Sequence, residues 1–245
     1  MMREEGYMNG LAENINRQPV KVSAKKGYER AVRSRFIKQA IFGSLFIALV
    51  IAGWSYSLIG YFIPLCMAAG VGLAAFRGRT WCNWMCPRGS FADTYMKAIS
   101  PGRFIPWALR KVPVRLGVIA FLMAMLTFQV MRLWPDGYAI GRLFITLLTV
   151  TTVIGILLAM FFHQRAWCSI CPIGSLSSWV GINRRTLKID RDSCITCGLC
   201  AKNCPMQLKP ADMKEMPAME FRGDCLKCEL CVRGCPKRSL TFGGK

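Results

Sequence analysis

Long apolar stretches alternate with basic segments along this chain of 245 residues. From residue 37 to residue 76, the only Lys, Arg, Asp or Glu is Lys38. One helix of that length would run about 60 Å, roughly twice the hydrocarbon core of a bilayer, so the stretch predicts two spans. Two more apolar stretches follow, and apolar stretches this long are seldom buried helices of a soluble protein. The four predicted spans lie near residues 37–54, 58–76, 114–133 and 140–162.

The charged residues flank these spans and predict a topology. The chain has 33 Lys and Arg against 13 Asp and Glu, and 53% of its residues are hydrophobic. The N-terminal segment up to and including Lys38 has nine basic residues, and the loop from Arg77 to Arg115 has eight. The turns within the two helical pairs carry basic residues only at their edges. By the positive-inside rule, both termini and the central loop should be cytoplasmic, in a bacterial inner membrane. Basic residues beside apolar spans indicate contact with anionic lipid rather than nucleic acid.

An internal repeat follows the second span of each helical pair. Arg79-Thr-Trp-Cys82-Asn-Trp-Met-Cys86-Pro-Arg-Gly-Ser matches Arg165-Ala-Trp-Cys168-Ser-Ile-Cys171-Pro-Ile-Gly-Ser, with one residue fewer between the second pair of cysteines. The sequence therefore predicts two helix-pair repeats, each of which places a Cys-Pro turn at the cytoplasmic surface.

Two interpretations of these paired cysteines stay open. Cys82, Cys86, Cys168 and Cys171 could converge as thiolate ligands of a third iron–sulfur cluster or as another thiolate redox centre. Alternatively, the prolines and glycines shape a turn and the cysteines are small buried residues. The four matched cysteines favour a redox centre, for which Arg79, Arg88 and Arg165 are expected to lower the thiol pKa values.

The C-terminal region carries two cysteine runs. Both have spacings of two, two and three residues and end in Cys-Pro, which is the pattern of bacterial ferredoxins with two [4Fe–4S] clusters. A zinc site is disfavoured, because zinc does not require the third cysteine of each run or the fourth cysteine that precedes proline. A disulfide framework is also disfavoured, because this region is predicted to be cytoplasmic. Because the fourth cysteine of each run ligates the other cluster, the predicted ligands are Cys194, Cys197, Cys200 and Cys235 for cluster one, and Cys225, Cys228, Cys231 and Cys204 for cluster two.

Other residues limit the function. The one histidine, His163, cannot supply the two ligands of a b-type haem, and we expect it to lie at the membrane interface, although a role in proton transfer to quinone stays open. Cys66 is expected to be a packing residue. The sequence has no glycine-rich nucleotide or flavin motif, so such a substrate would enter through a partner.

Together these motifs resemble a family. The spans, the Cys-Pro motifs and the double-cluster tail are similar to the membrane polyferredoxins typified by NapH, a quinol-dehydrogenase subunit, and related to NosR and the copper-handling CcoG/FixG proteins. In this family both Cys-Pro motifs have three residues between the cysteines, whereas the second motif here has two. The resemblance covers roughly residues 37 to 240.

The resemblance implies a function. It indicates an iron–sulfur electron-transfer subunit, part of a quinol dehydrogenase complex, that links the quinone pool to a redox partner. The alternatives are a copper-handling or copper-reducing membrane polyferredoxin and a passive membrane anchor of a larger oxidoreductase. The expected fold is a membrane all-α protein with a ferredoxin domain: a basic arm at 1–36, a four-helix membrane domain at 37–183 and a domain with two [4Fe-4S] clusters at 184–245.

Overall fold

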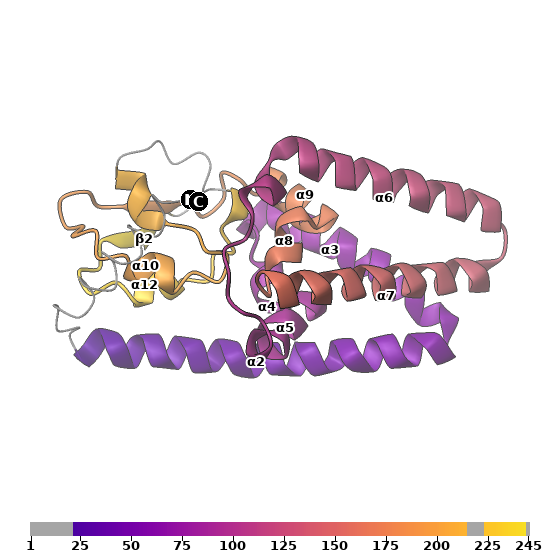
Figure 1. The fold of residues 1–245 in the computed structure, drawn as a ribbon, viewed down its shortest axis with the longest axis horizontal. Coiled ribbons are helices and arrows are strands. Elements are labelled where there is room, and N and C mark those ends of the chain that lie inside the picture. The colour runs from indigo at the N-terminus through magenta and orange to yellow at the C-terminus, as the bar shows by residue number, and fades with distance from the viewer. Residues whose placement is uncertain (1–21, 215–222, 244–245) are drawn as a thin grey trace.

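The computed structural model describes residues 22–214 and 223–243, so most of the basic arm lies outside the described residues. The molecule is elongated, with four long helices at one end and the cysteine-rich C-terminal region at the other (Figure 1). The predicted membrane helices are confirmed, because four helical segments are long and apolar enough to cross a bilayer: Gly27–Ser55, Ser57–Arg77, Val112–Leu133 and Gly137–Phe161. The fold is therefore that of a multi-pass, mostly helical membrane protein.

The first helix is longer than the sequence predicted. Helix α2 spans Val22–Ser55, and its 34 residues correspond to about 51 Å, well beyond the thickness of the hydrocarbon core. No proline lies between Val22 and the start of the predicted span at residue 37. The early part of the helix runs beside the C-terminal region (Figure 1), where the Tyr28 hydroxyl donates a hydrogen bond to Asn203 Oδ1 at 3.0 Å. The contact with the C-terminal region thus stabilises the part of α2 that is too long for the bilayer.

The remaining elements follow the internal repeat. In each repeat the second span leads into a short helix and then into a helix that begins after Cys-Pro. In the first repeat, the 3-10 turn η1 (Ser57–Tyr61) is followed by α3 (Phe62–Arg77), α4 (Trp81–Trp84) and α5 (Pro87–Thr94). In the second repeat, α6 (Val112–Leu133) is followed by α7 (Gly137–Phe161), α8 (Ala166–Ile170) and α9 (Pro172–Val180). Cys86 and Cys171 both have non-helical backbones, with ψ of 110° and 128°. A residue before proline avoids the helical region and proline suits the first helical position, so each Cys-Pro ends one helix and begins the next.

The central loop and the C-terminal region contain mainly short elements. The central loop has two 3-10 turns, η2 (Met96–Ala98) and η3 (Trp107–Arg110). Two strands, β1 (Leu187–Ile189) and β2 (Leu240–Phe242), pair antiparallel with Leu187 opposite Phe242 and bring the two ends of the region together. Between them lie α10 (Leu199–Lys202), η4 (Pro210–Lys214) and α12 (Leu230–Arg233). The cysteine runs therefore lie mostly in turns.

Glycines allow the two helix pairs to meet closely at the end far from the C-terminal region. A Cβ added to Gly141 on α7 would collide with the backbone carbonyl of Ser57, and one added to Gly60 would collide with the carbonyl of Gly141. Backbone atoms cannot move aside as a flexible side chain can. Small residues at such contacts are typical of helices packed within membranes.

We predict that Gly141→Ala destabilises the helical part by about 1–3 kcal/mol, because the added methyl group has no space. The measurement is the unfolding free energy of the detergent-solubilised protein. Gly117→Ala is the matched control, since no atom lies within 4 Å of a Cβ built there. Equal effects of the two substitutions would contradict the proposed backbone contact.

Candidate iron–sulfur centres

The four cysteines of the Cys-Pro motifs line one cavity. Cys82 lies on α4 and Cys168 on α8, while Cys86 and Cys171 precede the first residues of α5 and α9. All four contribute to the wall of a cavity of about 150 Å³, which we call the membrane-edge cavity. Its other walls are largely apolar and come from α2, α3 and α7. The structure therefore brings the two pairs together at the ends of the spans, while their ligation stays a prediction.

Two buried arginines cross between the repeats at this cavity. Arg79 of the first repeat donates a hydrogen bond to the carbonyl oxygen of Cys168, and Arg165 of the second donates to the carbonyl oxygen of Cys82 at 3.1 Å. Arg165 also approaches Cys168 Sγ at 3.6 Å. The repeated glycine after each Cys-Pro leaves room for this crossing, because a Cβ at Gly174 would lie 2.5 Å from Arg79 Nη2 and one at Gly89 would lie 2.9 Å from Arg165 Nη1.

A third arginine breaks the symmetry of the repeat. Arg88 follows Cys86-Pro87, where the second repeat has Ile173. Its guanidinium lies 4.5 Å from the centre of the Trp167 ring, and it donates hydrogen bonds to the side chain and the carbonyl of Thr151 on α7. Arg88 thus places a cation on the wall of the membrane-edge cavity, beside the sulfurs.

The thiol pKa values differ from the sequence expectation. Burial raises the pKa of Cys86 to about 12 and also raises that of Cys171, although Arg88 acts in the lowering direction on Cys171. The net pKa of both thiols is therefore raised rather than lowered: burial outweighs the lowering effect of Arg88 at Cys171, and the Cys82 thiol adds to the effect of burial at Cys86. Metal ligation would displace the protons of these thiols.

The C-terminal cysteines line two further cavities. Cys204 joins Cys225, Cys228 and Cys231 around one cavity of about 30 Å³, and Cys235 joins Cys194, Cys197 and Cys200 around another of about 20 Å³. Each cavity therefore receives three cysteines from one run and the fourth from the other. This is the crossed arrangement that the spacing predicts.

The backbone of the two runs repeats as well as their cysteines. Thr196 and Lys227 both have a positive φ, as do Gly198 and Glu229, and each pair occupies the same place in its run. These left-handed residues turn the chain tightly enough for successive cysteines to face one cavity. Non-glycine residues seldom adopt this conformation because it strains their backbone. Thr196, Lys227 and Glu229 adopt it where the cysteine-bearing turn requires it.

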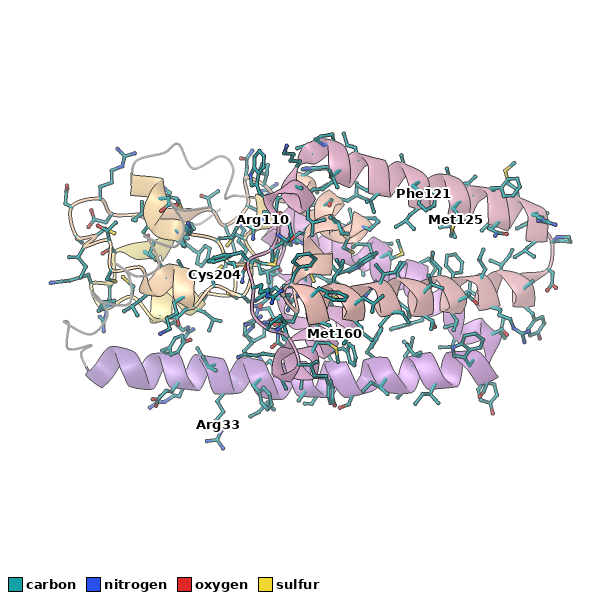
Figure 2. The ribbon with its side chains drawn as sticks, viewed as in Figure 1. Arg33, Arg110, Phe121, Met125, Met160 and Cys204 are labelled. Atoms are coloured by element: carbon teal, nitrogen blue, oxygen red, sulfur yellow. The ribbon has the colours of Figure 1, made fainter. Side chains whose placement is uncertain are left out.

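The three sets of cysteines lie in a definite order. One apolar cluster contains Cys82, Met206 and Leu226, with Cys168, Cys204 and Cys225 packed against it. A second cluster contains Cys231, with Cys200 and Cys235 packed against it. The cluster-two cysteines therefore lie between the membrane-edge cavity and the cluster-one cysteines, and Cys204 lies at the junction of the two halves of the molecule (Figure 2).

Within the described residues, no three His, Cys, Asp or Glu side chains are placed to hold a single metal ion. The thirteen cysteines instead line three separate cavities: Cys66 and the four cysteines of the Cys-Pro motifs line the membrane-edge cavity, and four cysteines line each of the other two. Their soft sulfur donors and spacing fit iron–sulfur clusters, which are held by four cysteine thiolates and carry one electron at a time.

His163 and Cys66 have surroundings that the sequence did not predict. His163 is buried within the protein, and its Nδ1 accepts a hydrogen bond from the Arg165 backbone N–H at 3.2 Å. Burial lowers the pKa of His163 to about 4, although Asp93 acts in the opposite direction. Cys66, on α3, lines the membrane-edge cavity.

Sequence reasoning also missed two acidic residues. The carboxylate of Asp93 accepts hydrogen bonds from Arg35 and Arg165, and that of Asp224 accepts them from Arg79 and Arg115. Burial alone would raise the pKa of Asp93, but Arg165 and then Arg35 outweigh it and lower the value to about 2. A signal was present, since between Glu29 and Asp190 only Asp93 and Asp136 are acidic.

Comparisons with known proteins agree with this arrangement. A family described as a 4Fe-4S binding domain matches residues 59–115 and 145–189, which contain both Cys-Pro motifs. A family described as a 4Fe-4S dicluster domain matches residues 183–240, which contain both C-terminal cysteine runs. No solved structure matches the chain.

Several curated proteins are distantly similar. The uncharacterized protein MJ0749 of Methanocaldococcus jannaschii is 28% identical over 66% of this chain and 70% of its own length. "Putative electron transport protein YccM" of Escherichia coli is 27% identical over 80% of this chain, and the match spans 63% of that protein. The methylamine utilization ferredoxin-type protein MauN of Paracoccus denitrificans is 42% identical, over 20% of this chain and 18% of its own length.

The crossed ligation predicts how pairs of substitutions combine. In Cys204→Ala/Cys225→Ala both changes affect cluster two, so cluster one should survive with about four iron atoms. In Cys204→Ala/Cys194→Ala both C-terminal clusters should be lost. Iron and sulfide analysis of the purified variants measures the difference, and the reverse result would show that each run holds its own cluster.

Four apolar helices, two Cys-Pro motifs matched by one 4Fe-4S family and a tail matched by another lead to one conclusion. The chain is a membrane-associated ferredoxin-type iron–sulfur protein with distant similarity to YccM and MauN.

Proposed function

We propose that this chain transfers electrons between the membrane quinone pool and a redox partner, as a subunit of a larger oxidoreductase complex. The route passes through a centre at the membrane-edge cavity, then cluster two, then cluster one. The observation that carries the proposal is the packing of Cys82 and Cys168 in the same apolar cluster as Cys204 and Cys225. This contact joins the membrane helices to the first of the two tail clusters.

The shape and lining of the membrane-edge cavity support a quinone as the membrane substrate. Apolar side chains such as Phe46, Phe62 and Ile63 come from the spans, whereas polar groups are few and include Arg88 and Thr152. Sites for small aromatic ligands are typically apolar with a few placed polar groups. A quinone ring in this cavity would lie beside the Cys-Pro cysteines, with access from the bilayer.

We predict that a reduced quinol analogue reduces the C-terminal clusters of the purified protein under anaerobic conditions. Cys86→Ala and Cys171→Ala should each slow this reduction at least tenfold, because they remove a ligand of the first centre. Rapid mixing with absorbance and EPR detection measures the rates, and dithionite reports directly on whether the tail clusters are intact.

Asp136→Asn is the control, since this exposed carboxylate caps α7 at the other end of the span and lines none of the three cavities. It should leave the rate unchanged. If quinol reduces no cluster in the unaltered protein while dithionite does, the chain is a passive anchor and the quinone proposal fails.

Copper handling is the second candidate. Met67 and Met96 line the membrane-edge cavity together with the four thiols, and thioether and thiolate sulfur are the ligands that Cu(I) prefers. Metal analysis of the purified protein separates the two candidates, because copper handling predicts copper at this cavity and quinol oxidation does not.

We also propose that both termini and the C-terminal region are cytoplasmic. Four spans put both ends of the helical part on one side, and the basic central loop and the start of α2 lie on the side of the C-terminal region (Figure 1). The positive-inside rule assigns that side to the cytoplasm.

We predict that a reporter fused after Lys245 is active only when it matures in the cytoplasm. The reason is the concentration of basic residues in the arm and the central loop, which resist translocation. The measurement compares a cytoplasm-active with a periplasm-active reporter at this position. Activity of the periplasmic reporter alone would reverse the topology.

A further inference from the structure

Two buried carboxylates each bind two arginines at the junction of the two halves of the molecule. Asp93 pairs with Arg35 and Arg165, both at 2.6 Å. Asp224 pairs with Arg79 at 3.3 Å and with Arg115 at 2.6 Å. All six side chains are at least nine-tenths buried. We call these groups the first and the second triad.

The arginines of the two triads correspond through the internal repeat. Arg79 and Arg165 occupy the same place in the two Arg-x-Trp-Cys motifs. Arg35 lies on α2 and Arg115 on α6, which are the first helices of the two pairs. Each carboxylate therefore receives one arginine from each helix-pair repeat: Asp93 binds Arg35 and Arg165, and Asp224 binds Arg115 and Arg79.

The carboxylates do not correspond. Asp93 stands seven residues after Cys86, and the residue seven places after Cys171 is Ser178. The second repeat thus lacks the acid that the first repeat provides for its triad. Its place is taken by Asp224, which belongs to the C-terminal region and directly precedes Cys225, a predicted ligand of cluster two.

Small residues make room for this substitution. Gly223 lies directly on Ser178, because a Cβ added to Gly223 would be 2.5 Å from Ser178 Oγ. Ser178 is itself buried. A larger side chain at residue 178 would occupy the space through which residues 223 and 224 enter the helical part.

We propose that Asp224 is a docking residue: it completes the second triad and thereby holds the dicluster region at a fixed position against the membrane-edge cavity. Removing one partner from a buried ion pair is strongly unfavourable, because a buried charge is left without compensation. Undocking would leave both Arg79 and Arg115 without their carboxylate. The second triad therefore opposes separation of the two halves.

The same triad joins two of the predicted centres. Arg79 binds the carbonyl oxygen of Cys168 and the carboxylate of Asp224. One guanidinium thus bridges a cysteine of the membrane-edge cavity to the residue next to Cys225. This part of the proposal rests on the proposed electron route, and it makes Asp224 a positioning residue for transfer between the first centre and cluster two.

Ser178→Asp provides the sharpest test. This substitution introduces a carboxylate at the position that corresponds to Asp93 in the repeat, so Arg79 keeps a charged partner. The larger side chain also fills the space that Gly223 occupies against residue 178. The dicluster region should then undock without leaving buried cations unpaired. Asp224→Asn removes the docking charge directly, and Ser178→Asp/Asp224→Asn combines both changes in case the single Asp224 variant does not fold.

Hydrogen exchange measures docking without reference to quinone. Backbone amides around Met206 and Leu226, which pack against Cys82, should exchange at least tenfold faster in the Ser178→Asp protein and in the double variant. Asp136→Asn is the control, because this exposed carboxylate caps α7 at the other end of the span. Unchanged exchange in both test variants would overturn the proposed docking.

Electron transfer measures the second part of the proposal. Reduction of the C-terminal clusters by a quinol analogue should slow at least tenfold in the same variants, while iron content and reduction by dithionite stay at the level of the unaltered protein. Faster exchange with unchanged quinol reduction would overturn the positioning role. If quinol fails to reduce the unaltered protein but exchange responds as expected, the docking stands and the proposed function fails.

Discussion

Four buried arginine side chains at the boundary between the helices and the dicluster region determine how the molecule is assembled. These side chains are too deeply buried for water to solvate their charges, and each pairs with Asp93 or Asp224. They belong to Arg35, Arg79, Arg115 and Arg165. A buried cation without such a partner would cost several kcal/mol. The position of the two carboxylates therefore fixes which elements must meet: α5 with α2 and the start of α8 in one triad, and the dicluster region with α6 and the segment before α4 in the other.

The two helical repeats share a framework but have diverged where their surroundings differ. The crossing of Arg79 and Arg165 is common to both, and so are the glycines that make room for it. Arg88 has no counterpart in the second repeat, and it adds to the membrane-edge cavity a cation that the repeat does not match. The resulting site has two cysteines from each repeat in an asymmetric electrostatic environment.

The order of the cysteine sets follows from apolar packing rather than from the cysteines alone. Met206, which follows the first C-terminal run, and Leu226 of the second run pack with Cys82, so the cluster-two cysteines lie next to the helical part. Cys231, Cys200 and Cys235 pack with Leu187 and Leu240 from the two strands at the other side. One set of tail cysteines therefore lies against the helical part, and the other set lies farther from it.

Local patterns in the sequence were sufficient for the spans, the repeat and the grouping of the C-terminal cysteines. Apolar length specifies a membrane helix, and cysteine spacing specifies a ferredoxin run, because both depend on residues that are close in the chain. The convergence of Cys82 and Cys168 could be expected from the repeat. The extension of α2 beyond the bilayer, by contrast, was hidden because its stabilising contact, between Tyr28 and Asn203, joins residues 175 positions apart.

The tertiary structure alone decided which charges are buried and what each of them pairs with. His163 sits at the end of a span, where exposure is the usual expectation, yet packing around Arg165 buries it. Likewise, the sequence shows Asp224 only as an acid beside a cysteine, while its partners Arg79 and Arg115 come from distant segments. Chain order carries no record of such pairings, because the energy of a buried charge depends on the groups that surround it in space.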